Sequence, residues 1–116
     1  MTDRRKIKRR YLLYYSRVFD AKTGDLIGNL VDITALGAML VSERPIPVDT
    51  VFRLKLELSE DVADKPFLEF TAKSLWSQPD IAPGSYNTGF QMLDIAPHDM
   101  EIIQRIIDAY GFRDNQ

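Results

Sequence analysis

Apolar and polar residues alternate along much of the chain with a period of two, which is typical of strands that bury one face. The clearest example is VFRLKLEL, residues 51–58. Its apolar side chains share one face: Phe52, Leu54, Leu56 and Leu58. In FLEFTAKSLW, residues 67–76, the same period places a second set on one face: Leu68, Phe70, Ala72, Ser74 and Trp76. Both segments are predicted strands.

Four further segments are predicted strands because they are rich in aromatic or β-branched residues, or alternate, between turn residues. They cover residues 11–19, 26–33, 38–42 and 85–93. The connections include DAKTGD after the first strand, the tight turn TALG at residues 34–37, and PDIAPG at residues 79–84. Residues 59–66 form a polar loop.

Near the C-terminus the apolar period changes to three and four residues. In PHDMEIIQRIIDAYG the apolar positions are Met100, Ile103, Ile106, Ile107 and Tyr110. Pro97 suits the first turn of a helix and Gly111 suits its end. This pattern predicts one amphipathic helix of three to four turns.

A chain of 116 residues is long enough for one hydrophobic core and short for two. Six antiparallel strands at short spacing favour a small barrel, because closure removes unpaired strand edges. One helix can then cover an opening. The predicted fold is all-β, a six-stranded antiparallel β-barrel with one C-terminal α-helix.

Charge is distributed unevenly between the N-terminus and the rest of the chain. Residues 1–10 carry six cations and one anion, whereas residues 11–116 carry nine cations and sixteen anions. Such an asymmetry is typical of chains that engage phosphate, nucleic acid or an acidic membrane face, although a solvated tail has the same composition. We therefore expect a flexible basic arm at residues 1–10 and a single barrel domain at residues 11–116.

The inventory of reactive side chains argues against an enzyme. The chain has no cysteine and one histidine, His98, so it lacks a Cys–His nucleophile pair and a two-histidine metal site. It also lacks a glycine-rich phosphate loop. Close pairs of carboxylates, such as Asp94 with Asp99, are interpreted as loop and helix-start anions. No apolar run approaches the ~20 residues of a membrane helix, and we expect a soluble, cytoplasmic protein.

Two short motifs remain, and each is weak when taken alone. RRKIKR places Arg5 and Arg9 four residues apart, with Arg4 in front. DITALG contains Asp32, Thr34 and Gly37, which by themselves describe an ordinary β-turn. In this order, ahead of alternating strands and a terminal helix, the two motifs resemble the PilZ domain, whose pattern is RxxxR followed by (D/N)xSxxG. Trp76 and the segment Gly89-Phe90-Gln91 are similar to later features of that family.

The resemblance implies a stand-alone receptor for the bacterial second messenger cyclic di-GMP, with no cofactor or metal. The ligand-binding residues it implies are Arg4, Arg5, Arg9, Asp32, Thr34 and Gly37. It also implies relay to an unidentified downstream protein when the arm becomes ordered. This chain differs from the family pattern in having Thr34 in place of serine and an additional cation, Arg10, beside Arg9.

These residue types suit the ligand. Arginine pairs bidentately with phosphate or with the O6 and N7 atoms of guanine, and it stacks on purines. The Asp32 carboxylate can accept hydrogen bonds from guanine N1–H and N2–H₂. We expect Gly37 to adopt a positive φ and to let the backbone approach the ligand. Trp76 is interpreted as core or rim packing, and Gly89 as the mark of a bulge or barrel bend.

Two alternatives stay open at this point. The first is a PilZ-like protein-interaction module that does not bind nucleotide. The second is a small nucleic-acid-binding barrel that uses the basic arm, although the acidic body and the lack of a basic, aromatic groove argue against it.

Overall fold

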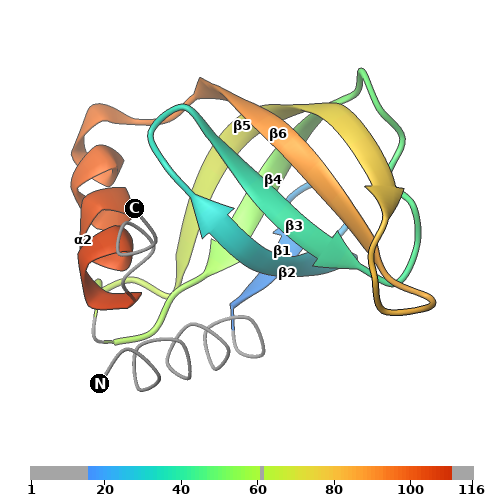
Figure 1. Ribbon diagram of the computed structural model, residues 1–116. Coiled ribbons are helices and arrows are strands. Elements are labelled where there is room, and N and C mark those ends of the chain that lie inside the picture. Colours follow the sequence, from blue (N-terminus) through green and yellow to red (C-terminus); the bar gives the residue numbers. More distant parts are fainter. Residues whose placement is uncertain (1–15, 61, 111–116) are drawn as a thin grey trace, which may run out of the picture.

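Six antiparallel strands close into a barrel in the spatial order β1-β2-β3-β6-β5-β4, as Figure 1 shows. The computed structural model describes residues 16–60 and 62–110, with side chains as far as residue 108. The strands are β1 (Arg17–Asp20), β2 (Leu26–Ile33), β3 (Gly37–Ser42), β4 (Val51–Glu57), β5 (Phe67–Pro79) and β6 (Tyr86–Asp94). A 3₁₀ turn, η1 (Pro97–Asp99), leads into the helix α2 (Met100–Tyr110). The predicted barrel with one C-terminal helix is confirmed.

Strand boundaries follow the sequence prediction to within one residue, except in the first and fifth strands. The first predicted strand covered residues 11–19, of which residues 11–15 lie outside the described residues, and β1 ends at Asp20. The fifth strand continues to Pro79 rather than ending at Trp76, because its last residues still pair with β6, as Pro79 does with Tyr86.

The barrel core comes from the strand faces that the alternation predicts. In β4, Leu54 and Leu56 are fully buried; Phe52 of the same strand and Leu58, directly after it, are partly buried and pack against the core. In β5 the predicted inner face is buried as far as Ser74. The buried members of that face are Leu68, Phe70, Ala72 and Ser74.

Trp76 does not continue this face, and here the prediction was wrong. Its side chain is 39% exposed because the pairing with β6 shifts by one residue between Ser74 and Trp76. Such a bulge inserts an extra residue and exchanges the two faces of the strand beyond it.

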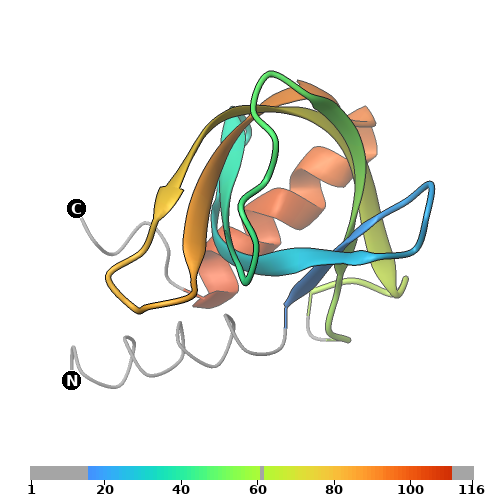
Figure 2. The same ribbon diagram turned by 90° about the vertical axis from the view of Figure 1, so that its right-hand side faces the viewer.

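Helix α2 covers one end of the barrel, opposite the open end that faces the viewer in Figure 2. It buries four isoleucines, Ile102, Ile103, Ile106 and Ile107, of which Ile102 was not predicted. At its start, the buried carboxylate of Asp99 accepts a 2.7 Å hydrogen bond from Lys65 Nζ, which joins the helix to the loop before β5. Asp99 is thus a helix-start anion, as interpreted from the sequence.

The short strand β1 is fixed to its neighbour β4 by a bidentate ion pair. Arg17 donates to the two carboxylate oxygens of Glu57 at 3.0 and 2.7 Å. This hydrogen bonding lowers the pKa of Glu57 and raises the pKa of Arg17. The pair therefore supports closure of the barrel at the strand that follows the N-terminal segment.

Candidate ligand-binding site

A bulge near the end of β2 determines which way Asp32 points. Leu30 pairs with Leu40 and Asp32 pairs with Met39, so Val31 is an extra residue in the ladder. Leu30 and Ile33 are both buried although they are three residues apart, and Asp32 is exposed. Without the bulge, a period of two would place Asp32 on the same inner face as Leu30. The bulge puts its carboxylate on the outer surface of the barrel.

The turn after β2 is organised by the side chain of Thr34. Its Oγ1 accepts hydrogen bonds from the backbone N–H groups of Leu36 at 3.1 Å and Gly37 at 3.3 Å. Thr34 N–H in turn donates to the carbonyl of Gly37 at 2.8 Å. The Leu36 carbonyl accepts from Met92 N–H, which attaches the turn to β6. Thr34 thus fixes the backbone and, like Asp32, lies on the outer surface.

Gly37 is required for a reason other than the expected one. The expectation of a positive φ was wrong, because within the described residues only Gly24 and Gly84 are glycines with positive φ. A Cβ on Gly37 would instead collide with the backbone carbonyl oxygen of Phe90 in β6. Glycine here permits close approach of two strands and leaves the outer surface without a side chain at that point.

The second bulge, in β5, is held by a buried network around Ser74. The Ser74 hydroxyl donates to the carbonyl of Pro47 at 2.6 Å and accepts from Thr50 N–H at 3.1 Å. The Ser74 backbone also exchanges hydrogen bonds with the loop before β4, through Asp49 N–H and the Thr50 carbonyl. Because these bonds fix the strand at Ser74, the face exchange takes effect at the next residues, Leu75 and Trp76.

The two bulges bring one row of residues together across four strands. Asp32 pairs with Met39, Met39 with Gly89, and Gly89 with Trp76. A Cβ on Gly89 would collide with the indole ring of Trp76, so the ring lies directly over this glycine. Of the two roles expected for Trp76, core or rim packing, its position on the outer surface excludes the core, and the bulge expected near Gly89 is in the partner strand opposite it.

A shallow cavity of about 250 Å³ lies along this row. It is lined by all three residues of the second motif, Asp32, Thr34 and Gly37, and by Trp76. In Figure 1, β3 and β6 carry this outer surface across the front of the barrel. Arg4, Arg5 and Arg9, the other predicted binding residues, lie outside the described residues.

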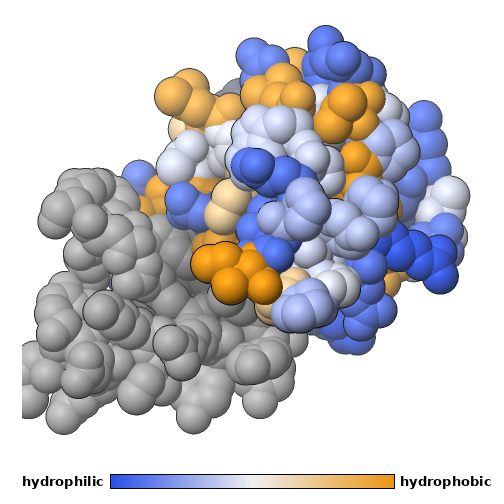
Figure 3. Space-filling view, turned by 45° about the vertical axis from the view of Figure 1, so that its right-hand side comes forward, coloured by the Kyte–Doolittle hydropathy of each residue, from blue (hydrophilic) through white to orange (hydrophobic). Residues whose placement is uncertain are grey.

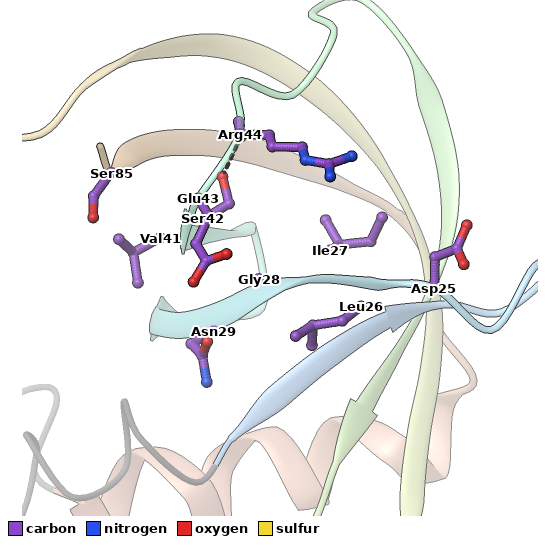
Figure 4. A pocket seen from close by; sticks show the side chains of 10 residues that line it. All are labelled: Asp25, Leu26, Ile27, Gly28, Asn29, Val41, Ser42, Glu43, Arg44 and Ser85. Atoms are coloured by element: carbon purple, nitrogen blue, oxygen red, sulfur yellow. Dashed lines mark hydrogen bonds between the residues drawn. The ribbon is translucent and has the colours of Figure 1, made fainter. Parts of the chain in front are cut away.

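A larger cavity of about 880 Å³ lies at the open mouth of the barrel. Figure 4 shows Arg44 extending over Ile27 there, with Asp25 and Ser85 at opposite sides. Of the predicted binding residues, the three that the structure describes, Asp32, Thr34 and Gly37, do not line it. Figure 3 shows apolar residues on this side of the molecule in several groups separated by polar ones.

No cluster of three or more metal-ligating side chains occurs in the part of the chain that the structure describes. Within residues 16–60 and 62–110, no helix is both long and apolar enough to cross a membrane.

The comparison with protein families identifies the chain. A family model of the PilZ domain matches residues 3–109, which is nearly the whole sequence. The chain belongs to the PilZ domain family. The match includes the N-terminal motif with Arg4, Arg5 and Arg9 as well as the turn with Asp32 and Thr34.

A solved structure supports the fold of this PilZ chain. It resembles the crystal structure of the PlzA protein of Borreliella burgdorferi in complex with c-di-GMP, with a TM-score of 0.54 and 16% sequence identity. The similarity covers 96% of this chain and 50% of that one, so the chain spans about half the length of its structural neighbour. No curated protein matches the chain by sequence.

Sequence reasoning did not assign Met39 and Leu75 to the PilZ cavity that they line. A signal was present for Leu75. Leu75 and Trp76 are consecutive large apolar residues in an otherwise alternating strand, which is typical of a bulge. Nothing comparable distinguishes Met39, whose position depends on pairing with Asp32 and Gly89.

The two cavity glycines should respond differently to an added methyl group. In Gly37→Ala the obstacle is the backbone of β6, so we expect a loss of roughly 1–3 kcal/mol in the free energy of unfolding. In Gly89→Ala the obstacle is the Trp76 side chain, which can move, so the cost should be smaller and the tryptophan fluorescence should shift to longer wavelength.

Urea unfolding and emission spectra of both variants test this prediction. Leu36→Ala is the matched control, because Leu36 is 83% exposed in the same turn. A Gly37→Ala variant as stable as this control would contradict the close approach of β3 and β6.

Proposed function

We propose that this PilZ domain is a receptor that binds cyclic di-GMP on the outer surface of the barrel, at the cavity lined by Asp32, Thr34, Gly37 and Trp76. The observation that carries the proposal is the paired bulges, which direct Asp32 and Trp76 outward at the two ends of one cross-strand row. Membership of the PilZ family supports it, as does the fold shared with a PlzA structure that contains c-di-GMP.

The barrel half of the site suits a guanine base. The Asp32 carboxylate is exposed, and one of its oxygens accepts Ile33 N–H at 2.9 Å, which orients the group. A carboxylate so placed can accept from guanine N1–H and N2–H₂, a pair of donors that adenine lacks. Thr34 Oγ1 uses its acceptor capacity within the turn, so its hydroxyl hydrogen can be donated to a ligand. The site would therefore select guanine.

The arm supplies the charge that the barrel lacks. Residues 11–116 carry a net charge of about −7 by count, which disfavours a dianionic ligand, whereas residues 1–10 carry about +5. Arg5 and Arg9 would clamp the phosphates or guanine edges, with Arg4 assisting. Binding would thus join the arm to the turn at Asp32 and Thr34.

Ligand-induced docking of the arm onto the barrel would be the signal. Six cations in ten residues repel one another, and Ile7 is the one sizeable apolar side chain of the RRKIKR segment. Burial of apolar surface therefore cannot offset the cost of ordering the backbone, which is ~1–2 kcal/mol per residue. The contacts of the arginines with a bound dianion would offset this cost. An ordered arm presents a new surface to a downstream protein. We accordingly propose a cytoplasmic binding module without catalytic activity, consisting of an arm at residues 1–10 and a barrel domain at residues 11–116.

Arg5→Ala and Arg9→Ala should each weaken cyclic di-GMP binding more than tenfold. Losing a charge-assisted contact costs roughly 1.5–3 kcal/mol, and about 1.4 kcal/mol corresponds to tenfold. Isothermal titration calorimetry measures the effect, with GTP and a short single-stranded oligonucleotide as ligand controls. Lys6→Ala is the matched variant and should cost much less. Equal losses for lysine and arginine variants would show that the arm acts as undirected charge.

Asp32→Ala should lower the affinity for cyclic di-GMP and reduce the preference for it over cyclic di-AMP, because the acceptor for the guanine edge is gone. The melting temperature should fall only slightly, because Asp32 lies on the exposed outer surface of the barrel. Titrations with both dinucleotides, together with a thermal melt, measure the two effects. A large loss of stability with unchanged selectivity would make Asp32 a turn residue.

Cyclic di-GMP should protect the arm from trypsin. Cleavage between Arg4 and Arg10 should be fast for the free protein and slow at saturating ligand, because an arm bound to ligand cannot enter the protease. GTP at the same concentration should give no protection. Equal cleavage with and without cyclic di-GMP would refute arm closure even if the ligand binds.

A further inference from the structure

A second cross-strand row lies on the same outer surface, next to the row that contains Asp32. Thr34 bonds to Gly37, Gly37 pairs with Gln91, and Gln91 pairs with Lys73. Residues on both sides of Gln91 and Lys73 in their strands point inward. Phe90 and Ser74, for example, are buried. The side chains of Gln91 and Lys73 therefore point outward, beside the cavity.

The row has a gap where a ligand can approach. Gly37 has no side chain, and it lines the cavity together with Thr34. Neighbouring strands lie about 4.8 Å apart, which puts Lys73 roughly 14 Å from Thr34 along the row. The long, flexible stem of lysine shortens that gap. A ligand bound at Thr34 and extending over Gly37 would reach Gln91 and then the Lys73 ammonium.

The charge of Lys73 is available for such a ligand. Within the described residues, no carboxylate lies within ion-pair distance of its ammonium group. The nearest acidic residue on the outer face of its own strand is Glu69, which pairs with Arg53 at 3.4 Å. On β6, Asp94 is opposite Thr71, two residues along β5 from Lys73. Lys73 is half-buried, and it pairs with Val51 on one side and with Gln91 on the other.

We propose that Lys73 and Gln91 form a phosphate-binding extension of the site, in which Lys73 supplies a cation and Gln91 an amide donor. This inference rests on the proposed cyclic di-GMP binding and assigns the phosphate contacts of the barrel itself. In this arrangement the row that begins at Asp32 would recognise guanine, and the row that runs from Thr34 through Gly37 to Lys73 would bind phosphate. The ligand then has a charged contact on the barrel before the arm closes.

Lys73→Gln should weaken cyclic di-GMP binding about fivefold, and the dissociation constant should depend less steeply on salt, because a screened charge contact is gone. Lys73→Arg should keep most of the affinity. Lys55→Gln is the matched control, since Lys55 is also half-buried and outward-facing, but on β4 with its ammonium 4.4 Å from the Phe67 ring centroid. Titration calorimetry at two salt concentrations gives these values.

The outcomes separate the two proposals. Binding by the unaltered chain and by Lys55→Gln, with a fivefold loss and a reduced salt dependence in Lys73→Gln, supports the inference. Equal affinity and equal salt dependence of Lys73→Gln and Lys55→Gln would overturn the inference and leave the receptor proposal intact. Failure of the unaltered chain to bind cyclic di-GMP would overturn both.

Discussion

The candidate site depends on two bulges that exchange the faces of their strands. A strand has a period of two, so every residue beyond an inserted position changes sides. In β2 the extra residue moves Asp32 outward and Ile33 into the core, where Leu30 also lies. In β5 the shift after Ser74 does the same for Trp76. Without the bulge in β2, regular alternation would direct Asp32 inward. Without the bulge in β5, it would direct Trp76 inward.

The rest of the barrel holds these two irregularities in place. Ser74 is buried and bonded to the loop before β4, so the β5 bulge has a fixed starting point. The Thr34 turn and its bond from Met92 to the Leu36 carbonyl attach the end of β2 to β6. Closure of the sheet and the isoleucine face of α2 provide the core against which both strands pack. A site on paired strands is positioned more precisely than one on a free loop.

The fold could be predicted because regular alternation and a change of period are local properties of the sequence. The strict pattern around Leu54 and Leu56, and the isoleucines of the helix, required no knowledge of distant contacts. The outward orientation of Trp76 could not be predicted in this way, because it depends on hydrogen bonds from Ser74 to a loop some 25 residues away. The role of Gly37 was likewise hidden, since it is set by Phe90 in another strand.

The central claim is that cyclic di-GMP binds the outer surface between the two bulges and not the larger cavity at the barrel mouth. Titration of ¹⁵N-labelled protein with cyclic di-GMP, followed by amide NMR, tests it directly. We predict shifts of the backbone signals of Leu36 and Gly37 and of the Trp76 indole N–H, with the signals of Ile27 and Arg44 unchanged. Shifts confined to Ile27, Arg44 and their neighbours at the mouth would contradict the account.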